Sequence, residues 1–250
     1  MTSTGRFVWF EYVSKDASKA QGFFGELFGW STKNVPMPDG AYTMIAAPDG
    51  PTIGGYFPPP DGAGPQAAWL PYLLVPSAGD IAAKVKSLGG SVMKEPYKVG
   101  DFATMAVVLD PLGAALALWQ PNKPEEPAKP AAGHFVWNEL SSKTPEASVK
   151  FYSQIGGFTS SKMDMGEMGT YHVLESGGQG RAGIMAQQMP GAPHAWLPYV
   201  QVASADQTAD KAKRLGATIV VPPTDIPNVG RFAIFVDAQG AATGILQPQP

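Results

Sequence analysis

The 250-residue sequence predicts an α+β fold of two tandem domains, each made of two βαβββ modules. Two observations lead to this prediction. The pentapeptide AWLPY occurs at residues 68–72 and again at 195–199, and the segments around it recur in the same order. Within each copy, stretches of strand periodicity surround two helical stretches. Homologous segments in a constant order indicate a duplicated domain, not a loop used twice.

The repeat covers nearly the whole chain. Residues 5–30 align with 133–158 at an offset of 128, with 9 identities in 26 positions. Around AWLPY, residues 68–96 align with 195–223 at an offset of 127, with 14 identities in 29 positions. Between the copies, PNKPEEPAKPAA has a proline at every third position, which favours an extended, semi-rigid spacer. We therefore expect domain one at 1–121, a linker at 122–132 and domain two at 133–250.

The elements of the first copy follow from their periodicity. RFVWFEYV alternates Phe7, Trp9 and Glu11 on one face with the intervening residues on the other, which is typical of a strand. DASKAQGFFGELFGW spaces its apolar residues as a helix does. Further strands are expected at 41–48, 51–57, 68–76, 92–98, 103–109 and 114–120, and a second helix at 78–88 before Gly89. In the second copy, Thr144 can cap a helix that begins with Pro145 and Glu146.

The composition excludes several classes of function. The net charge is −3 without a basic run, so nucleic acid is not an expected partner. No cysteine is present, which excludes disulfides, thiolate metal sites and a cysteine nucleophile. No apolar run approaches the roughly 18–20 residues of a membrane helix, and no signal peptide is visible at the N-terminus. We expect a soluble, cytoplasmic protein without membrane partners.

Several motifs occur in both copies: FVWFEY…FFGELFGW and FVWNEL…FYSQIGGF, the DPLGA and DAQGA turns, and the Leu-Gly helix ends at 88–89 and 215–216. With these motifs the sequence resembles the vicinal oxygen chelate superfamily of glyoxalases, bleomycin-resistance proteins and extradiol dioxygenases. The resemblance covers essentially the whole chain and is strongest to the two-domain glyoxalase-like branch. It implies tandem glyoxalase-like domains in which the paired modules form a curved, cup-like mixed sheet with flanking helices.

The resemblance also implies four positions per domain for the ligands of a divalent metal, which needs three or four converging N or O donors. Carried over residue by residue, these positions hold side chains that cannot coordinate a metal: Trp9, Gly54, Leu70 and Ala117 in domain one, and Trp137, Gly183, Leu197 and Gly244 in domain two. We therefore predict no metal and no other cofactor. A divalent metal would return only if this register is wrong.

Glu11 and Glu139 lie two residues after the tryptophans at the first of these positions, so strand alternation places them in the same cups. A carboxylate there could act as a general base or anchor a polar group of a ligand. The structural alternative is a buried glutamate bonded to a backbone amide or to an arginine. The sequence offers three such partners, Arg6, Arg181 and Arg231.

Aromatic residues supply the other candidate ligand-binding side chains. Tryptophans suit a flat apolar ligand, and a phenol could donate a hydrogen bond inside a cup. Plain core packing is the competing explanation for all of them. The candidates are Trp9, Trp137, Trp69, Trp196, Trp119, Tyr42 and Tyr171.

The histidines and one methionine-rich segment are weaker candidates. His134, His172 and His194 occur only in domain two and form no repeated constellation, so we do not expect a metal cluster from them. KMDMGEMG at 162–169 could be a flexible loop that covers an apolar ligand, or an ordinary surface loop.

The leading hypothesis is a protein that binds a small apolar or aromatic molecule without the metal. The alternative is a lyase, isomerase or dioxygenase, either metal-free with Glu11 or Glu139 as the base or using an unrecognised metal site. In a third hypothesis, one half has become a structural partner of the other. The expected partner is a small-molecule ligand, and the duplicated halves are expected to pack as an intrachain pseudo-dimer, whether the chain is a monomer or a homodimer.

Overall fold

The computed structural model describes residues 4–37, 40–60, 66–124, 129–189 and 191–249. It confirms the α+β class and the βαβββ modules. The first half contains β1 (Phe7–Val13), α1 (Ala17–Phe28), β2 (Ser31–Met37), β3 (Gly40–Ala46), β4 (Thr52–Phe57), β5 (Ala68–Leu74), α2 (Ala78–Ser87), β6 (Ser91–Val99), β7 (Ala103–Leu109) and β8 (Ala115–Pro121). Residues 125–128 of the predicted linker lie outside the described residues.

The second half repeats this order. It contains β9 (Phe135–Ser142), α3 (Pro145–Gly156), β10 (Thr159–Asp164), a 3₁₀ turn η1 (Gly166–Met168), β11 (Thr170–Ser176), β12 (Gln179–Ala186), β13 (Ala195–Gln201), α4 (Ala205–Arg214), β14 (Thr218–Ile226), β15 (Gly230–Val236) and β16 (Ala242–Pro248). Pro145 begins α3 as predicted, but the Thr144 side chain makes no capping hydrogen bond. It does not cap α3 in the way the sequence suggested.

β2 is a strand that the periodicity did not reveal. Between α1 and β5, sequence analysis placed two strands, whereas the structure has three. β2 reads STKNVPM, and its described side chains are almost all exposed. Such a strand buries little apolar surface, so it lacks the alternation that marks a strand with one buried face. It pairs antiparallel with β3 at the end of the sheet, where Pro36 is tolerated.

Each half forms one mixed sheet of eight strands. The strand orders are β2-β3-β4-β1-β5-β8-β7-β6 and β10-β11-β12-β9-β13-β16-β15-β14. Parallel pairs join the first and fourth strands of each module, as in β1 with β4 and β9 with β12, and the hairpins are antiparallel. The duplicated sequence therefore gives the same topology twice.

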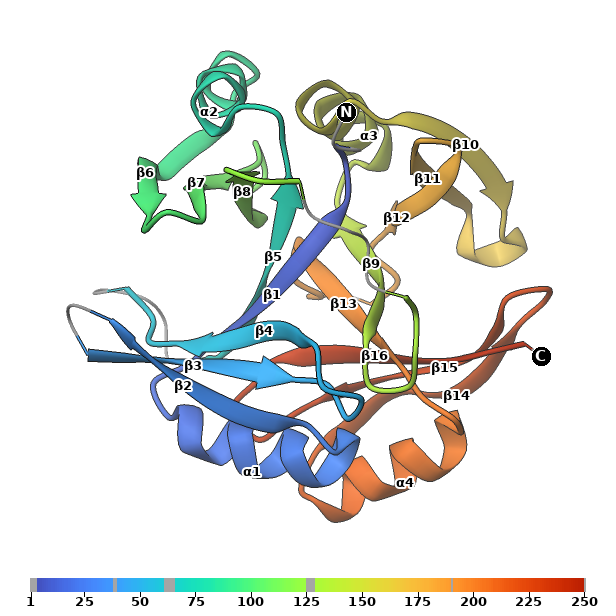
Figure 1. Cartoon of the computed structure of the whole chain (residues 1–250). Helices are drawn as coiled ribbons and strands as arrows, with labels where there is room; N and C mark the ends of the chain where they lie inside the picture. The colour runs from blue at the N-terminus through green and yellow to red at the C-terminus, as the bar shows by residue number, and fades with distance from the viewer. Residues whose placement is uncertain (1–3, 38–39, 61–65, 125–128, 190, 250) are drawn as a thin grey trace. The chain divides into compact units, whose positions relative to one another are not determined.

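The compact units of the chain cut across the two sequence halves. Unit 1 comprises Met1–Val8, Leu70–Ala128 and Trp137–Trp196, and unit 2 comprises Trp9–Trp69, Lys129–Val136 and Leu197–Pro250. Each unit thus combines one module from each half. In Figure 1, α1 and α4 cover one side of the unit 2 strands, and α2 and α3 belong to unit 1.

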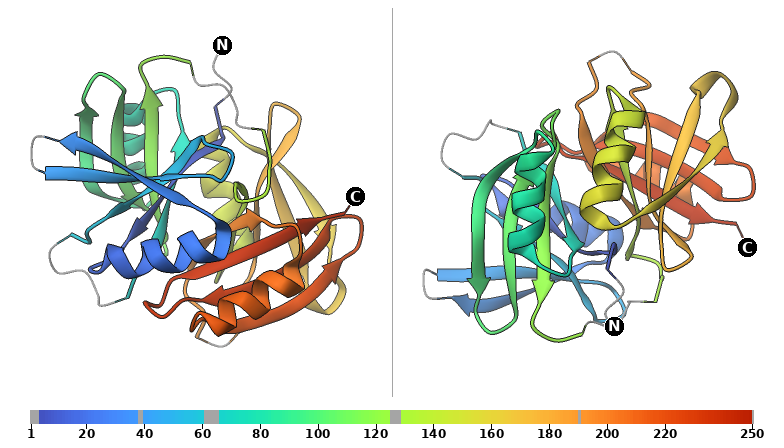
Figure 2. Two further views of the ribbon diagram at one scale, coloured as in Figure 1. Left: turned by 60° about the horizontal axis from the view of Figure 1, so that its bottom comes forward. Right: turned by 90° about the horizontal axis from the view of Figure 1, so that it is seen from above.

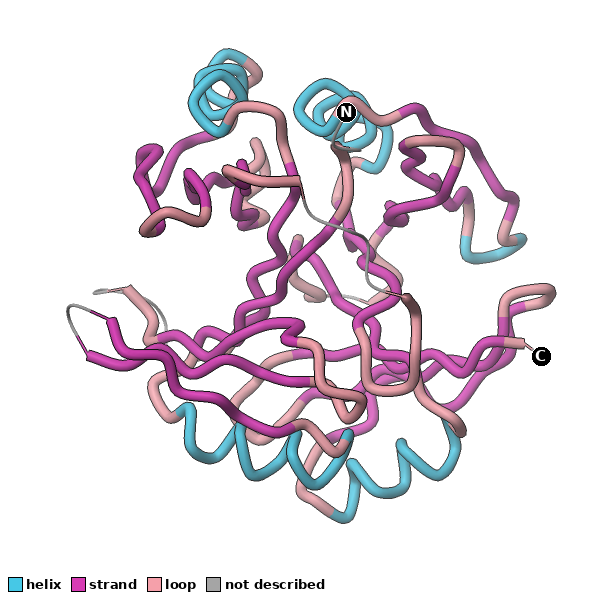
Figure 3. The backbone as a smooth tube through the Cα atoms, viewed as in Figure 1, coloured by secondary structure: helices cyan, strands magenta, loops and turns pink. Residues whose placement is uncertain are grey.

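Each helix packs on the strands of its own module. α3 contacts β10, β11 and β12, and α4 contacts β14, β15 and β16, as the left view of Figure 2 shows for α4. The opposite face of each four-stranded segment carries no helix of its module, which Figure 3 shows in the contrast of cyan helices and magenta strands. In the described part of the chain, no helix is long and apolar enough to span a membrane.

Candidate functional site

Three predicted site residues of unit 2 meet on the face of β1, β3 and β4. The indole nitrogen Nε1 of Trp9 donates a hydrogen bond of 3.0 Å to the hydroxyl of Tyr42. That hydroxyl donates in turn to Oε1 of Glu11 at 2.8 Å. Trp9 and Glu11 are two residues apart on β1, so both point to the same side. The result is a directional chain from indole to phenol to carboxylate.

The same chain recurs in unit 1. Trp137 Nε1 donates to the Tyr171 hydroxyl at 2.8 Å, which donates to Oε2 of Glu139 at 2.9 Å. Burial raises the pKa of the Tyr171 phenol well above its usual value, and the charge of Glu139 adds to the effect. The phenol therefore stays protonated and remains a donor at neutral pH.

A glycine on the neighbouring strand makes room for each phenol. Glu11 pairs with Gly55 across β1 and β4, and Glu139 pairs with Gly183 across β9 and β12. A Cβ atom at Gly55 would overlap the Tyr42 hydroxyl, and one at Gly183 would overlap the Tyr171 hydroxyl. A side chain at either position would expel the tyrosine. Gly55 is thus the counterpart of Gly183.

This register corrects the sequence analysis at one position. The second family metal position in domain one was placed at Gly54, which pairs instead with Phe10. Strand alternation then turns position 54 to the opposite face from Glu11. The cause of the error is the loop between β3 and β4, which is one residue longer in the first half than its counterpart in the second. The offset between the halves is 129 at Tyr42 and Tyr171 but 128 at Gly55 and Gly183.

The face opposite to Glu139 packs under α3. His172, Leu174 and Ile184 alternate with Tyr171 and Gly183 along their strands, and all three are buried. In unit 2, Tyr12 is fully buried on the corresponding side of β1, against Phe24 of α1. The Trp-Tyr-Glu chains therefore lie on the helix-free faces of their modules.

Trp69 and Trp196 do not join these chains. Trp69 packs on Tyr12 with ring centroids 5.0 Å apart, and its Nε1 donates to Thr243 at 2.9 Å. Trp196 packs on Tyr152 at 4.9 Å and donates to the Tyr152 hydroxyl at 3.1 Å. Both indoles are buried. Each belongs to the aromatic core under the helices, because Trp69 also packs on Phe24 of α1 and Tyr152 is part of α3.

Sequence analysis missed two aromatic side chains, Tyr72 and Tyr199. Tyr72 lies beside Trp119 of β8, a predicted residue, with ring centroids 5.8 Å apart. Tyr199 is the counterpart of Tyr72, and its ring centroid lies 6.4 Å from that of Phe232. The signal for both tyrosines was present, because each ends an AWLPY pentapeptide, three residues after the tryptophan and therefore on the other face.

The residues at the family metal positions do not fit a divalent ion. In the corrected register they are indoles, glycines, leucines and an alanine, which offer no imidazole or carboxylate: Trp9, Gly55, Leu70 and Ala117, with Trp137, Gly183, Leu197 and Gly244. At the second position the space next to the glycine is filled by the tyrosine phenol. Among the described residues, no three His, Cys, Asp or Glu side chains are grouped as a metal site would require.

The three histidines lie apart from the chains. His134 Nε2 bonds to Asp49 at 2.7 Å, and this contact lowers the pKa of the Asp49 carboxyl. His194 Nε2 bonds to Asp110 at 2.7 Å in the core of unit 1. His172 is buried, and its nearest carboxylate oxygen, on Glu146, is 3.8 Å away. The three histidines therefore lie at separate places, and His172 has no hydrogen-bond partner among the described residues.

The structural alternative for the glutamates was a bond to a backbone amide or to an arginine. Arg231 forms ion pairs with Asp206 at 2.7 Å and Asp225 at 2.9 Å. Arg181 donates to the backbone oxygen of Ser176 at 3.2 Å. The hydrogen bonds described above give each glutamate a tyrosine as a donor, a pairing that the sequence suggested only as a shared cup.

Comparison with known proteins places this chain in a family. The model of the "Glyoxalase/Bleomycin resistance protein/Dioxygenase superfamily" matches residues 131–244. "Putative glyoxylase CFP32" of Mycobacterium bovis is 36% identical over 97% of this chain and 94% of the relative. "Anthracycline biosynthesis protein DnrV" of Streptomyces peucetius is 31% identical over 97% and 93%.

Solved structures share the fold. The Mn(II)-bound glyoxalase from Novosphingobium aromaticivorans superposes with a TM-score of 0.67 at 16% identity, over 99% of this chain and 83% of the other. The 2,2',3-trihydroxybiphenyl 1,2-dioxygenase from Sphingomonas wittichii gives 0.68 at 12% identity, over 99% and 91%. With the relatives above, the chain belongs to the glyoxalase/bleomycin resistance protein/dioxygenase superfamily.

Proposed function

We propose that the protein binds a small apolar or aromatic molecule on the helix-free faces that carry the Trp-Tyr-Glu chains, without the divalent metal of metal-dependent relatives. The observation that carries the proposal is the phenol of Tyr171, which fills the space beside Gly183 and donates to Glu139. The same arrangement recurs at Tyr42, Gly55 and Glu11. The duplicate copies thus replace a metal-ligand position with an organic polar centre.

Each Trp-Tyr-Glu hydrogen-bond chain has the properties of a recognition site. The indoles of Trp9 and Trp137 are fixed by their hydrogen bonds to the phenols, so each presents a planar surface at little further cost in entropy. The carboxylates add acceptor oxygens next to an apolar wall. Pockets for small molecules commonly combine such apolar walls with a few placed polar groups. A flat ring that carries a hydrogen-bond donor would complement this combination.

The names of the relatives support a small-molecule ligand. DnrV is named for anthracycline biosynthesis and CFP32 as a glyoxylase. Anthracyclines are flat, fused-ring molecules. Such rings suit an aromatic face better than a small aldehyde adduct, which a metal would bind by chelation. This makes fused aromatic rings the first class of ligand to screen.

The test is a thermal-shift screen of flat aromatic molecules against the chelator-treated protein, followed by calorimetric titration of the hits. Binding must raise the melting temperature by linkage. Tyr42→Phe/Tyr171→Phe should weaken binding while the fold is retained. If binding requires added Zn²⁺, Ni²⁺, Mn²⁺ or Fe²⁺, or if no aromatic molecule stabilises the protein, the proposal is wrong.

A second candidate is a metal-free lyase or isomerase. It is favoured by Glu11, which is only 6% exposed and accepts a hydrogen bond of 2.8 Å from the Tyr42 hydroxyl, so that its carboxylate is held in place as a base would be. In this reaction Glu11 or Glu139 would remove a proton next to a carbonyl, and the phenol would stabilise the developing charge. Glu11→Gln and Glu139→Gln, made separately and together, should then abolish turnover but leave binding of the substrate. Retained turnover in the double variant excludes this candidate.

A further inference from the structure

Two methionines flank Tyr171 on the helix-free face of unit 1. Met163 of β10 is the direct cross-strand partner of Tyr171. Met185 of β12 lies two residues after Gly183, the glycine that faces the Tyr171 hydroxyl. Directly paired residues and residues two apart on a strand share a face. Met163, Tyr171 and Met185 therefore form a row on the same surface as Trp137 and Glu139, here called the methionine row.

The matching row in unit 2 has a different chemistry. Val35 of β2 is the cross-strand partner of Tyr42. Phe57 follows Gly55 by two residues on β4 and is 46% exposed. The two units thus repeat the Trp-Tyr-Glu chain but differ on both sides of the tyrosine. A branched and a rigid aromatic side chain replace two long thioethers.

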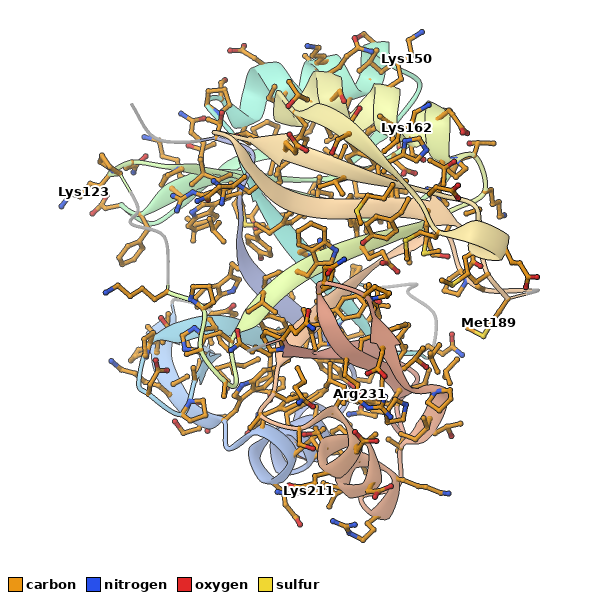
Figure 4. The ribbon with its side chains drawn as sticks, turned by 90° about the vertical axis from the view of Figure 1, so that its right-hand side faces the viewer. Lys123, Lys150, Lys162, Met189, Lys211 and Arg231 are labelled. Atoms are coloured by element: carbon orange, nitrogen blue, oxygen red, sulfur yellow. The ribbon has the colours of Figure 1, made fainter. Side chains whose placement is uncertain are left out.

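Two more methionines lie in the segments that follow β10 and β12, the strands of Met163 and Met185. Met163 itself is 43% exposed, Met168 of η1 is 47% exposed and Met189 is 42% exposed. The two loops that carry Met168 and Met189 are tied together, because Gln188 Nε2 donates to the Met168 carbonyl at 3.2 Å and to the Ala186 carbonyl at 2.9 Å. Met189 is labelled in Figure 4, on the same side of the molecule as Lys162 of β10.

Exposing methionine side chains to water on a sheet face is unfavourable, so the number of methionines here needs a reason. Methionine has three rotatable bonds and a polarizable sulfur, and it makes favourable contacts with aromatic rings at many angles. It therefore adapts to rings of variable width, whereas Val35 and Phe57 set a fixed width.

We infer that Met163 and Met185 determine specificity on the β9–β12 face and select fused aromatic rings there, with the ring edge at the thioethers and a ring substituent at Tyr171 and Glu139. This inference rests on the proposed function and assigns the two faces different ligands. The β1–β4 face, with Val35 and Phe57, takes a narrower single ring.

The test uses doxorubicin as a fused-ring probe and the intact protein. Binding is measured by calorimetry, and the methionine methyl groups are observed by NMR with methyl-labelled methionine. We expect the Met163 and Met185 methyl signals to shift on titration, because ring currents act only at short range. Met163→Ala/Met185→Ala should weaken doxorubicin binding about tenfold, since each sulfur–aromatic contact contributes about 0.3–1.5 kcal/mol. Met163→Leu/Met185→Leu should recover part of the loss.

The control is Met93→Ala, because Met93 is 58% exposed on β6 and lies outside both rows. It should bind doxorubicin like the wild type. A Val35→Ala/Phe57→Ala variant should also leave the methionine signals and the affinity for doxorubicin unchanged.

The outcomes separate the two proposals. If doxorubicin binds and Tyr171→Phe weakens it, but the methionine double variant binds like the wild type, the inference fails and the proposed function stands. If doxorubicin binds and only the Val35/Phe57 variant weakens it, the faces are assigned the wrong way round. If neither doxorubicin nor any single-ring aromatic binds, both fail together.

Discussion

Tyr12 and Asp237 are 225 residues apart in the chain, and the Tyr12 hydroxyl donates a hydrogen bond of 2.6 Å to Oδ2 of Asp237. The other carboxylate oxygen accepts the backbone N–H groups of Gln239 and Ala241 at 2.8 and 3.2 Å. One buried aspartate therefore holds the turn before β16 and fastens it to β1. In unit 1 a tyrosine of a helix has the related role, because Tyr152 of α3 donates to Oδ2 of Asp110 at 3.0 Å.

Tyr12→Phe should destabilise the protein by about 1–3 kcal/mol, because it leaves a buried carboxylate oxygen without its donor. Urea denaturation at neutral pH measures the change as a lower midpoint. In a double-mutant cycle with Asp237→Asn, the two effects should not add, since they remove the same bond. Additive effects would mean that the two side chains act independently.

Alkaline pH should unfold the protein as its buried phenols ionise. Burial and neighbouring carboxylates raise the pKa values of Tyr12, Tyr152 and Tyr171 above their ordinary value. These groups bind protons more tightly when folded, so their contribution is complete below about pH 10 and is lost as the pH rises further. Phenolate absorbance and circular dichroism followed together should show these tyrosines titrating only with unfolding. Their ionisation in the folded protein would contradict the structure.

Gly183→Ala should displace the Tyr171 phenol and break its bond to Glu139, because the new methyl group overlaps the hydroxyl. We expect a loss of about 1–3 kcal/mol of stability, typical of overpacking, and weaker ligand binding on this face. Gly79→Ala is the control, because a Cβ atom there meets no neighbour within 4 Å in helix α2. It should be neutral or slightly stabilising. In a double-mutant cycle with Tyr171→Ala, the two losses of stability should not add, because the alanine removes the ring that the new methyl group overlaps. Additive losses would indicate a purely backbone effect at position 183.

Asn138→Leu should stabilise the protein. Asn138 is fully buried in β9, and its amide nitrogen and oxygen have no hydrogen-bond partner among the described residues. Its counterpart in the repeat, Phe10, stacks on Phe135 with centroids 4.1 Å apart. Removing two unsatisfied groups should raise the free energy of unfolding by about 1–3 kcal/mol. Thermal and urea denaturation measure it, and Asn138→Asp should do the opposite. A loss of stability in the leucine variant would show that bound water satisfies the amide.

The repeat was sufficient to predict the fold class and most of the elements, because the second copy gives the same elements in the same order and each helix α1 to α4 has a buried face. It did not predict β2, whose polar residues carry no burial signal. It also placed Trp69 and Trp196 in the cups. Tyr72 and Tyr199, three residues later in AWLPY, face the opposite side of the strand. Tryptophan is large and apolar on either side of a sheet, so its type alone does not fix its face.

The candidate site was partly predictable for a related reason. Strand alternation places Glu11 with Trp9 and Glu139 with Trp137, so their proximity follows from local spacing. The hydrogen bonds through Tyr42 and Tyr171 depend on strand register over more than 30 residues, and a single extra residue in the loop changed the register used for Gly54. The compact units, which join modules from different halves, lie beyond any local pattern.

The close fit of tyrosine and glycine also limits the order in which this protein can change over generations. A histidine or glutamate introduced at position 55 or 183 would collide with a phenol that is already in place, so the first mutation toward a metal ligand would be harmful while the tyrosine remains. The tyrosine would have to shrink first, at the cost of the bond to the glutamate. A metal ligand at position 55 or 183 therefore requires two substitutions in a fixed order, with the tyrosine replaced first.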